Sequence, residues 1–504
     1  MSQPSGSVRQ SLVFSFVERY GSLLISLVST TILSRILTPS EIGVYSVAIA
    51  AIGLAQTLRD FGISNYLIQA REIDDQTIRT AMTASFLLSG GLGAILFALG
   101  PFLASYYDQA GIHDVVNVVC INMVLIPFGA TLLAMLRREM RFKEIARINL
   151  SASIVGTSVS VACALGDLGF MSLAYGAVAG VAVTTLGAVA TNGRLQWFKP
   201  SLHGGGSIFH FGGYASTAAV VGEINARIPE FTLAKTLNFD AVGMFGKAYS
   251  AVYLVTTTVF ESVGSVFLPA VARGIRAGED CSDLYCRSLN YVTAIVLPIY
   301  AAIMVLAPPM VNLLFGNQWG PAAPLATALA CSAAVYALGF GIEHVLIASG
   351  QIRSLVLLRL VVIGPTLCVF LFVPRFGLEI VAYATIPIAV LYVTSAYVAT
   401  AATLQLRIGR LLKIFLRNTL VAIIVALPAM AIGARWDGSA LSSVLVLSAF
   451  GGAGTLAWCV ALRVLDHELL QEINRVLMRF GFVTPALRAV VVGRKNAFGD
   501  MNEK

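Results

Sequence analysis

The sequence predicts an all-α integral membrane protein of about fourteen transmembrane helices, arranged as two six-helix bundles plus two C-terminal helices. Three observations lead to this prediction: the composition, the recurrence of long apolar segments and an internal repeat. Of the 504 residues, 57% are hydrophobic and only 12% are charged, and the mean hydropathy is +0.82. Soluble domains carry about 25% charged residues. This composition therefore excludes an ordinary soluble globular protein.

Apolar segments that are long enough to cross a bilayer as helices recur along the whole chain. The first of them follows a polar N-terminal stretch and has no small-residue cleavage site after it, so we expect it to stay in the protein as a helix. The predicted spans lie at residues 12–34, 42–58, 81–104, 115–136, 148–165, 171–191, 212–234, 244–268, 289–311, 322–347, 354–373, 379–402, 414–432 and 441–462.

Basic residues gather in alternate loops, which predicts the orientation of the chain. If the N-terminus is cytoplasmic, the opposite side carries few cations: Arg35, Lys235 and Lys247 near helix ends, Arg375 and Arg435. The positive-inside rule then places both termini in the cytoplasm. After residue 465, apolar residues at helical spacing alternate with basic ones, which predicts a helix on the inner leaflet. We expect disorder from residue 493 onward. The cytoplasmic loops hold Arg59, Arg71, Arg79, Arg137, Arg138, Arg141, Lys143, Arg147, Arg194, Lys199, Arg273, Arg276, Arg287, Arg353, Arg359, Arg407, Arg410, Lys413 and Arg417.

An internal repeat relates the two halves of the chain. Shifted by 200 residues, LSRILTPSEIGVYSVA (33–48) aligns with LAKTLNFDAVGMFGKA (233–248), and a second match appears at a shift of 212. The first match pairs the first predicted helix with the seventh. The second match pairs the fourth with the tenth, so both matches are six helices apart. The matched pairs are Leu33/Leu233, Arg35/Lys235, Leu37/Leu237, Gly43/Gly243, Ala48/Ala248, Phe128/Phe340, Gly129/Gly341, Arg141/Arg353 and Arg147/Arg359.

Six spans separate the copies, so both halves should have the same orientation, related by an axis along the membrane normal. Transporters are often built in this way, with substrate held between two lobes that move against each other. We therefore predict an N-terminal lobe at residues 1–200 and a second lobe at 201–405. Helices thirteen and fourteen occupy 406–464, and an amphipathic and disordered cytoplasmic tail occupies 465–504.

Several ionisable residues fall inside the predicted spans. Each costs at least about 2.5–3.5 kcal/mol at a helix centre, so it should face a cavity or a partner. Glu223, Arg227 and Glu230 share one face of the seventh helix by their spacing. Glu18 and Arg19 are adjacent, about 100° apart on the first helix, so they cannot face one partner. The eighth helix holds Lys247 and Glu261, and the tenth holds Glu343 and His344.

These residues suggest a water-filled cavity whose cations bind an anionic substrate. Arginine suits phosphate groups because it forms bidentate hydrogen bonds. Plainer interpretations stand beside this one: a structural ion pair on the seventh helix, snorkelling side chains on the first, helix-end anchors on the seventh and eighth, and a satisfied buried pair on the tenth. The candidate substrate-binding cations are Arg19, Arg227, Lys235 and Lys247. The candidate coupling or cavity acids are Glu18, Glu223, Glu230, Glu261, Glu343 and His344.

Other classes of chemistry lack their sequence signatures. The chain contains no phosphate-binding G-x-x-x-x-G-K-[ST] loop, no nucleophile elbow and no zinc motif, so we expect no cofactor, no metal and no direct use of ATP. The seven cysteines fall mostly in apolar segments, where a buried thiol is the ordinary interpretation. The basic residues lie in short loops, which argues against nucleic acid as a partner.

Four segments carry a resemblance to a known family: residues 33–48, DFGISNYLIQ (60–69), RREMRFKEIARINL (137–150) and LNFDAVGMFGKAYS (237–250). Over about residues 10–460 the chain resembles the polysaccharide transporters, or Wzx-type oligosaccharide flippases, of the multidrug/oligosaccharidyl-lipid/polysaccharide exporter superfamily. The resemblance implies two six-helix bundles around a V-shaped cavity and alternating access. It implies flipping of polyprenyl-diphosphate-linked oligosaccharide units across the bacterial inner membrane for exopolysaccharide or lipopolysaccharide biosynthesis. Arg227 and Arg19 would then contact diphosphate or acidic sugar groups. Membrane lipids, and the polymerase and chain-length proteins of the same pathway, would be its partners.

Three alternatives to a flippase remain at this point. A drug or small-molecule antiporter of the same superfamily would share the architecture. A membrane-bound polymerase or ligase would need a sizeable exposed catalytic loop, and the loops between the predicted spans are short. A structural scaffold would tolerate the loss of Arg227, whereas a flippase would not.

Overall fold

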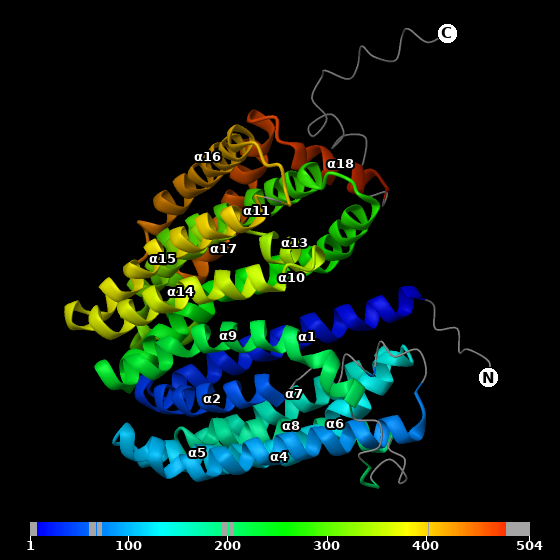
Figure 1. Ribbon diagram of the computed structural model, residues 1–504. Helices are drawn as coiled ribbons and strands as arrows, with labels where there is room; N and C mark the ends of the chain where they lie inside the picture. Colours follow the sequence, from blue (N-terminus) through cyan, green and yellow to red (C-terminus); the bar gives the residue numbers. More distant parts are fainter. Residues whose placement is uncertain are drawn as a thin grey trace. The chain divides into compact units, whose positions relative to one another are not determined.

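In the computed structural model, residues 8–59, 67, 73–192, 199–201, 206–401 and 403–479 are described, and the regular elements among them are helices. They are drawn in Figure 1. The helices are α1 (Val8–Ile36), α2 (Pro39–Arg59), α4 (Asp75–Tyr106), α5 (Ala110–Val119), α6 (Ile121–Arg138), α7 (Phe142–Leu165), α8 (Met171–Asn192), α9 (Gly206–Thr236), α10 (Phe239–Ala277), α11 (Ser282–Phe315), α12 (Ala322–Ala337), α13 (Ile342–Ala348), α14 (Ile352–Phe372), α15 (Leu378–Thr400), α16 (Ile408–Gly433), α17 (Ala440–Val464) and α18 (Glu468–Arg479), with short 3-10 turns η2 (Asn317–Trp319) and η3 (Pro374–Phe376).

The predicted all-α membrane architecture is confirmed. Within the described residues, twelve helical segments are long and apolar enough to cross a membrane, and the bent pair α12 and α13 makes a thirteenth. Helix α9 coincides with the predicted span 212–234 but is too polar to qualify by apolar composition alone. Each of the fourteen predicted spans thus coincides with a helix or a pair of consecutive helices.

Two predicted single spans are interrupted. The span predicted at 115–136 consists of α5 and α6, which meet at Cys120. The span predicted at 322–347 consists of α12 and α13, which are bent by 40° at a break where Gly341 has a φ of +83°. The Tyr397 hydroxyl donates to the Leu338 carbonyl across 2.6 Å, so this break in a membrane helix keeps a backbone acceptor satisfied. The apolar run continues through both breaks and hides them in the sequence.

The chain divides into two compact units. The first comprises residues 1–251, 311–329 and 350–392, and the second comprises residues 252–310, 330–349 and 393–504. Four of the five boundaries fall inside α10, α11, α12 and α15, so one end of each of these helices belongs to the first unit, and the fifth lies between α13 and α14. The lobe and tail boundaries at residues 200, 405 and 464 stay predictions. The two units are described separately below.

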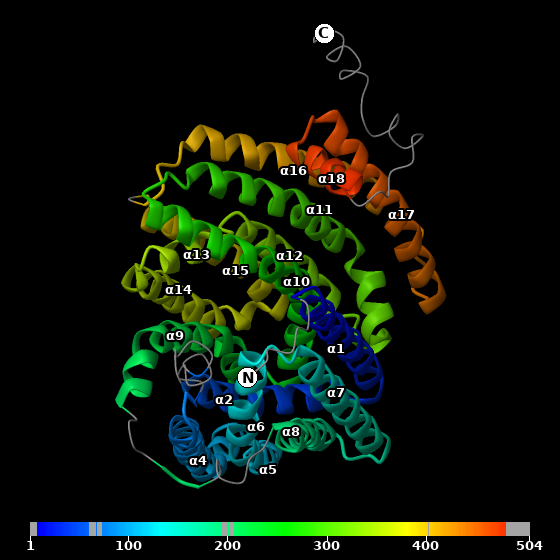
Figure 2. The ribbon, with the colours of Figure 1, turned by 90° about the vertical axis from the view of Figure 1, so that its right-hand side faces the viewer.

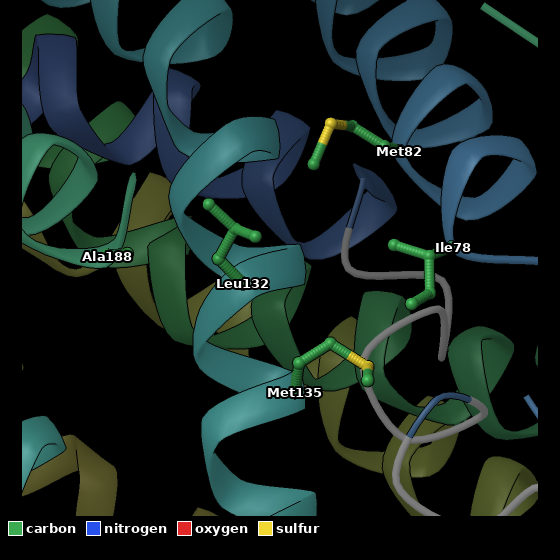
Figure 3. Close-up of a cluster of buried hydrophobic side chains, with 5 residues drawn as sticks. All are labelled: Ile78, Met82, Leu132, Met135 and Ala188. Carbon is green, nitrogen blue, oxygen red and sulfur yellow. The ribbon is translucent and has the colours of Figure 1, made fainter. Parts of the chain in front are cut away.

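In the first unit, helices pack through apolar side chains and through glycine. Figure 3 shows Ile78 and Met82 of α4 facing Leu132 and Met135 of α6, with Ala188 of α8 completing the cluster. Helices α7 and α8 approach more closely. A Cβ on Gly176 would lie 2.6 Å from the carbonyl oxygen of Gly156 and would overlap the Ser160 hydroxyl. Small residues let membrane helices make this kind of contact, because side chains do not separate the two backbones.

In the second unit, a buried polar network holds the tail helix α18. His467, between α17 and α18, accepts a hydrogen bond at Nδ1 from the Leu469 amide, so its Nε2 carries the proton and faces Asn290 and Asn418 at 3.0 and 2.9 Å. Burial lowers the pKa of His467 to about 4, which keeps the ring neutral at physiological pH. Leu469 and Ile473 pack beside Ala294, Val421, Ala461 and Leu462. The predicted helix after residue 465 is present as α18. The predicted disorder from 493 and the motif at 60–69, apart from Leu67, lie outside the described residues.

Candidate functional site

The turn between α1 and α2, which we call the first corner, is fixed by a capping box. The Thr38 amide and hydroxyl donate to Glu41 Oε2 at 2.7 and 2.8 Å, and the Thr38 hydroxyl accepts from the Glu41 amide at 3.3 Å. Pro39 occupies the first helical position, where its missing N–H leaves no helical hydrogen bond unmade. The sequence TPSE thus ends one helix and starts the next within two residues.

The turn between α9 and α10 repeats this geometry 200 residues later, and we call it the second corner. Asn238 takes the place of Thr38 as the cap, and its Oδ1 accepts from the Ala241 amide at 2.8 Å. Leu233 and Leu237 close the last turn of α9 as Leu33 and Leu37 close that of α1, with amide-to-carbonyl distances of 2.9 and 2.8 Å. The repeat seen in the sequence is therefore a repeat of backbone structure.

The two corners contact each other through their matched glycines. A Cβ on Gly43 would overlap the carbonyl oxygen of Phe239, and a Cβ on Gly243 would overlap the carbonyl oxygen of Pro39. Pro39 and Phe239 are themselves 200 residues apart, so each copy gives the other the same contact. This is the pattern of a two-fold, self-complementary interface, here between two parts of one chain.

Lys235 and Lys247 lie close to this crossing. Lys235 Nζ donates to the Tyr106 carbonyl at 2.6 Å and sits 4.7 Å above the Tyr106 ring. Lys247 Nζ lies 5.3 and 5.6 Å from the ring centres of Phe315 and Trp319. Both lysines thus have protein partners, Lys235 at the end of α9 and Lys247 within α10. Their predicted contact with substrate stays a prediction.

The cluster on α9 forms around Arg227. Its Nε donates to Glu223 Oε1 at 2.8 Å and its Nη1 donates to Glu230 Oε1 at 3.4 Å. The three side chains keep 31%, 23% and 22% of their surface exposed, so the cluster is only partly buried. Gly53 of α2 faces it: a Cβ there would lie 3.1 Å from Glu223 Oε1 and 3.4 Å from Arg227 Nη2. Figure 1 shows α9 running beside α2. The three residues predicted to share a face therefore do so and meet.

The side chains of Glu18 and Arg19 have different surroundings, as their spacing predicts. Asn149 Nδ2 of α7 donates to Glu18 Oε1 at 2.5 Å, while Arg19 is exposed. Glu18 and Asn149 belong to the wall of a groove of about 610 Å³ between α1, α7 and α8, three helices that lie together in Figure 2. The groove is also lined by small and hydroxyl-bearing residues: Ser22, Ser29, Thr30, Ser153, Gly156, Thr157, Ser160, Gly176, Gly180 and Thr184.

The remaining candidates belong to the second unit. His344 lies between the rings of Phe267 and Phe340, with centre-to-centre distances of 6.1 and 6.2 Å, and faces Gly264. Glu343 precedes it and is half-buried, and Glu261 of α10 is exposed. No group of three or more His, Cys, Asp or Glu side chains arranged for a metal ion occurs within the part of the chain that is described.

Sequence reasoning missed two partners of these charges, Asn149 beside Glu18 and Gly53 beside the Arg227 cluster, and it missed the contact that Arg359 makes with α9. Arg359 Nη1 donates to the Ala218 carbonyl at 2.5 Å and lies against Gly222. The repeat match of Arg147 with Arg359 marked that position without indicating its partner. A glycine facing a charge and an amide facing a carboxylate leave no spacing pattern, because both contacts join different helices.

Comparison with known proteins gives the chain its relatives. It is 25% identical over 338 residues to the lipopolysaccharide biosynthesis protein WzxC of Escherichia coli (strain K12), covering 65% of this chain and 67% of that protein. It is 23% identical over 331 residues to the succinoglycan biosynthesis transport protein ExoT of Rhizobium meliloti (strain 1021), covering 65% and 66%. The matched stretches thus span about two thirds of each relative.

Two further comparisons concern the fold and the family. The lipid II flippase MurJ, in an inward closed conformation, superposes with a TM-score of 0.72 at 12% identity, covering 90% of this chain and all of that one. At that identity the likeness shows the fold. The sequence profile of a family described as polysaccharide biosynthesis protein matches residues 32–324, more than half of the chain. This protein therefore belongs to the polysaccharide biosynthesis protein family and shares the fold of the lipid II flippase MurJ.

Proposed function

We propose that this protein flips a polyprenyl-diphosphate-linked oligosaccharide across the bacterial inner membrane by alternating access, for exopolysaccharide or lipopolysaccharide biosynthesis. Three facts support the proposal: membership of the polysaccharide biosynthesis protein family, the transport role in the name of ExoT, and a fold shared with a lipid II flippase. Both termini lie in the cytoplasm, as the distribution of basic residues suggests. Polymerase and chain-length proteins of the same pathway would use the product.

The observation that carries the proposal is the position of Arg227. It is a partly exposed cation inside a membrane helix, where α9 of the second copy faces α2 of the first. Its Nε and Nη1 are engaged by the carboxylates, while Nη2 is directed toward the small residue Gly53. A guanidinium binds phosphate through paired N–H donors, so Arg227 can receive a diphosphate while the apolar polyprenyl tail stays in the bilayer. Arg19, exposed on α1, is a second candidate for anionic sugar groups.

The two acids beside Arg227 supply a means of coupling. With both carboxylates ionised, the one cation and two anions of the cluster leave a net formal charge of −1, which repels a diphosphate. Glu230 Oε2 is buried without a hydrogen-bond donor among the described residues, and leaving such an atom unsatisfied costs about 1–3 kcal/mol. A proton on Glu230 would neutralise the cluster and favour anion binding. Proton uptake and substrate binding would therefore support each other.

The experiment is translocation of a labelled polyprenyl-diphosphate oligosaccharide in proteoliposomes. Arg227→Ala should lower the rate by roughly 10- to 100-fold, since a hydrogen bond to a charged group contributes about 1.5–3 kcal/mol. Arg375→Ala is the matched control, because Arg375 is exposed within η3, over the Phe376 ring, and should leave the rate unchanged. Absence of translocation by the wild-type protein under a proton gradient of either sign, together with drug efflux, would identify a small-molecule antiporter instead.

A further inference from the structure

The C-terminal end of α1 is held by the second copy of the repeat. Arg35 Nη2 donates to the Leu313 carbonyl at 2.9 Å. In the opposite direction, Trp319 Nε1 and Gln318 Nε2 donate to the Ser34 carbonyl at 2.7 and 2.5 Å. Carbonyls at a helix C-terminus have no partner within their own helix. Here the loop after α11 supplies donors for them.

The C-terminal end of α9 is held by the first copy in the same manner. Lys235 Nζ donates to the Tyr106 carbonyl at 2.6 Å, and the Tyr107 hydroxyl donates to the Phe231 carbonyl at 3.0 Å. Tyr106 and Tyr107 end α4 and begin the loop that follows it. Since α4 and α11 are the third and ninth spans, they are counterparts in the repeat. Each copy therefore gives a cation to a carbonyl in the last turn of the other's helix, α11 or α4, and receives a hydrogen-bond donor near the end of its own α1 or α9.

We call these four residues and the crossing glycines the double latch: Arg35, Trp319, Lys235, Tyr107, Gly43 and Gly243. All of them lie in the first compact unit, which contains the corner ends of α10, α11 and α12. We propose that the double latch is a gate that closes the non-cytoplasmic end of the substrate path between the two copies, and that Arg35 and Lys235 position it. The inference rests on the proposed function and on the predicted orientation.

The chemistry of the double latch suits a contact that opens and closes. Its cations bind backbone carbonyls at the surface, so opening leaves no charge buried without a partner. At the crossing, glycine brings the two backbones into direct contact without interlocked side chains, so separation requires no side chain to withdraw. Because the contact is reciprocal, a movement of one copy against the other releases both halves together. A static scaffold requires neither the symmetry nor the exposed cations.

The test measures access to Ser34, which is fully buried beneath the latch. A Ser34→Cys reporter is placed in a variant whose seven native cysteines are replaced, and its labelling by a membrane-impermeant maleimide is timed from the non-cytoplasmic side. Gly43→Ala with Gly243→Ala should speed labelling at least about tenfold, since each added methyl overlaps a backbone oxygen. Gly246→Ala is the control, because a Cβ there meets no atom within 4 Å.

A second pair of variants tests the latch without steric strain. Arg35→Met with Lys235→Met removes both cations that donate across the copies, keeps side chains of considerable length, and should speed labelling of the same reporter several-fold. A Ser89→Cys reporter distinguishes opening from unfolding. Ser89 is equally buried between α4 and α6, so its labelling should stay slow in all variants.

The outcomes separate the gate from a scaffold. Fast labelling at Ser34→Cys alone supports the gate. Unchanged labelling in the methionine pair, or equal acceleration at both reporters, would overturn it. The assay contains no oligosaccharide, so its result does not depend on whether the protein flips one. If Lys235 instead binds substrate, as the sequence also suggests, Lys235→Met would slow transport and leave the labelling unchanged.

Discussion

The two copies of the repeat agree at their corners and differ in the middle of the same helices. At the corners, Gly43 and Gly243 make one reciprocal contact, and Thr38 and Asn238 cap the following helix in equivalent places. About five turns earlier, position 18 of α1 is a glutamate bound to Asn149, whereas its repeat position, 218 of α9, is an alanine whose carbonyl binds Arg359. The copies thus share a frame and carry different chemistry.

The difference separates the role of the helix ends, which join the two copies, from the role of the mid-helix charges. The corners contact each other through glycines and backbone atoms. Each copy needs its own glycine for this contact, so a larger residue in either copy would disrupt it. Mid-helix charges need only suit their own surroundings, so each copy has been free to change. The Glu18 groove, between α1, α7 and α8, and the Arg359 contact, between α9 and α14, occupy the same place in the repeat with opposite charge. Coupling and substrate chemistry are therefore to be sought where the copies differ.

The largest expected effect tests whether the copies differ in packing as well as in charge. Gly176→Ala places a methyl 2.6 Å from the Gly156 carbonyl oxygen in the crossing of α7 and α8. Overpacking of this kind costs about 1–3 kcal/mol. Gly364→Ala on α14, in the second copy, meets no atom within 4 Å and should cost nothing measurable. Thermal unfolding in detergent compares the two, and equal melting temperatures would mean that the first copy is no more tightly packed here than the second.

A smaller effect is expected at Arg359, which contacts Ala218, the residue at the repeat position of Glu18. Arg359→Met removes the donor to the Ala218 carbonyl and should lower stability by roughly 1.5 kcal/mol, the lower end for a charged donor. Arg353→Met, six residues earlier and exposed, is the control. Thermal unfolding again gives the readout. If both variants melt alike, the hydrogen bond of Arg359 does not hold α14 to α9, and its position beside Ala218 serves another purpose than stability.

The sequence predicts the helices and their faces well, because composition, apolar length and spacing along one helix determine them. All fourteen spans coincide with helices, and Glu223, Arg227 and Glu230 meet as their spacing requires. The repeat also predicts that Gly43 and Gly243 are equivalent. Spacing reports only on one helix at a time, however. It cannot show that the two glycines touch each other's copies, because that contact joins residues 200 apart in the chain.

The breaks in α5–α6 and α12–α13 show a second limit. Membrane helices can bend or break without losing apolar character when a neighbouring group satisfies the freed backbone, as Tyr397 does at Leu338. Contacts with the backbone are also the reason that the sequence marks Arg35 and Lys235 only as cations near helix ends. Their partners are carbonyl oxygens, which every residue has, so no side-chain pattern marks them.

The smallest expected change in stability, and the sharpest test of the comparison, comes from Glu18→Gln. Glutamine keeps the shape of the side chain and can still accept the hydrogen bond of Asn149, so stability should change by less than about 0.5 kcal/mol. The substitution removes the negative charge of Glu18 from the groove between α1, α7 and α8. If that charge takes part in coupling, the translocation rate should lose part of its dependence on pH or on the cation gradient while the protein melts as before.

A matched change at the repeat position completes the test. Ala218→Gln places the same side chain on α9, where the Arg359 guanidinium already lies against the helix, and should cost stability without altering the dependence on the gradient. Coupling that survives Glu18→Gln would exclude the groove as a coupling site and leave the Arg227 cluster on α9. The asymmetry between the copies would then reside in that cluster, because the first copy has no charge at the three matching positions, which are Leu23, Leu27 and Thr30.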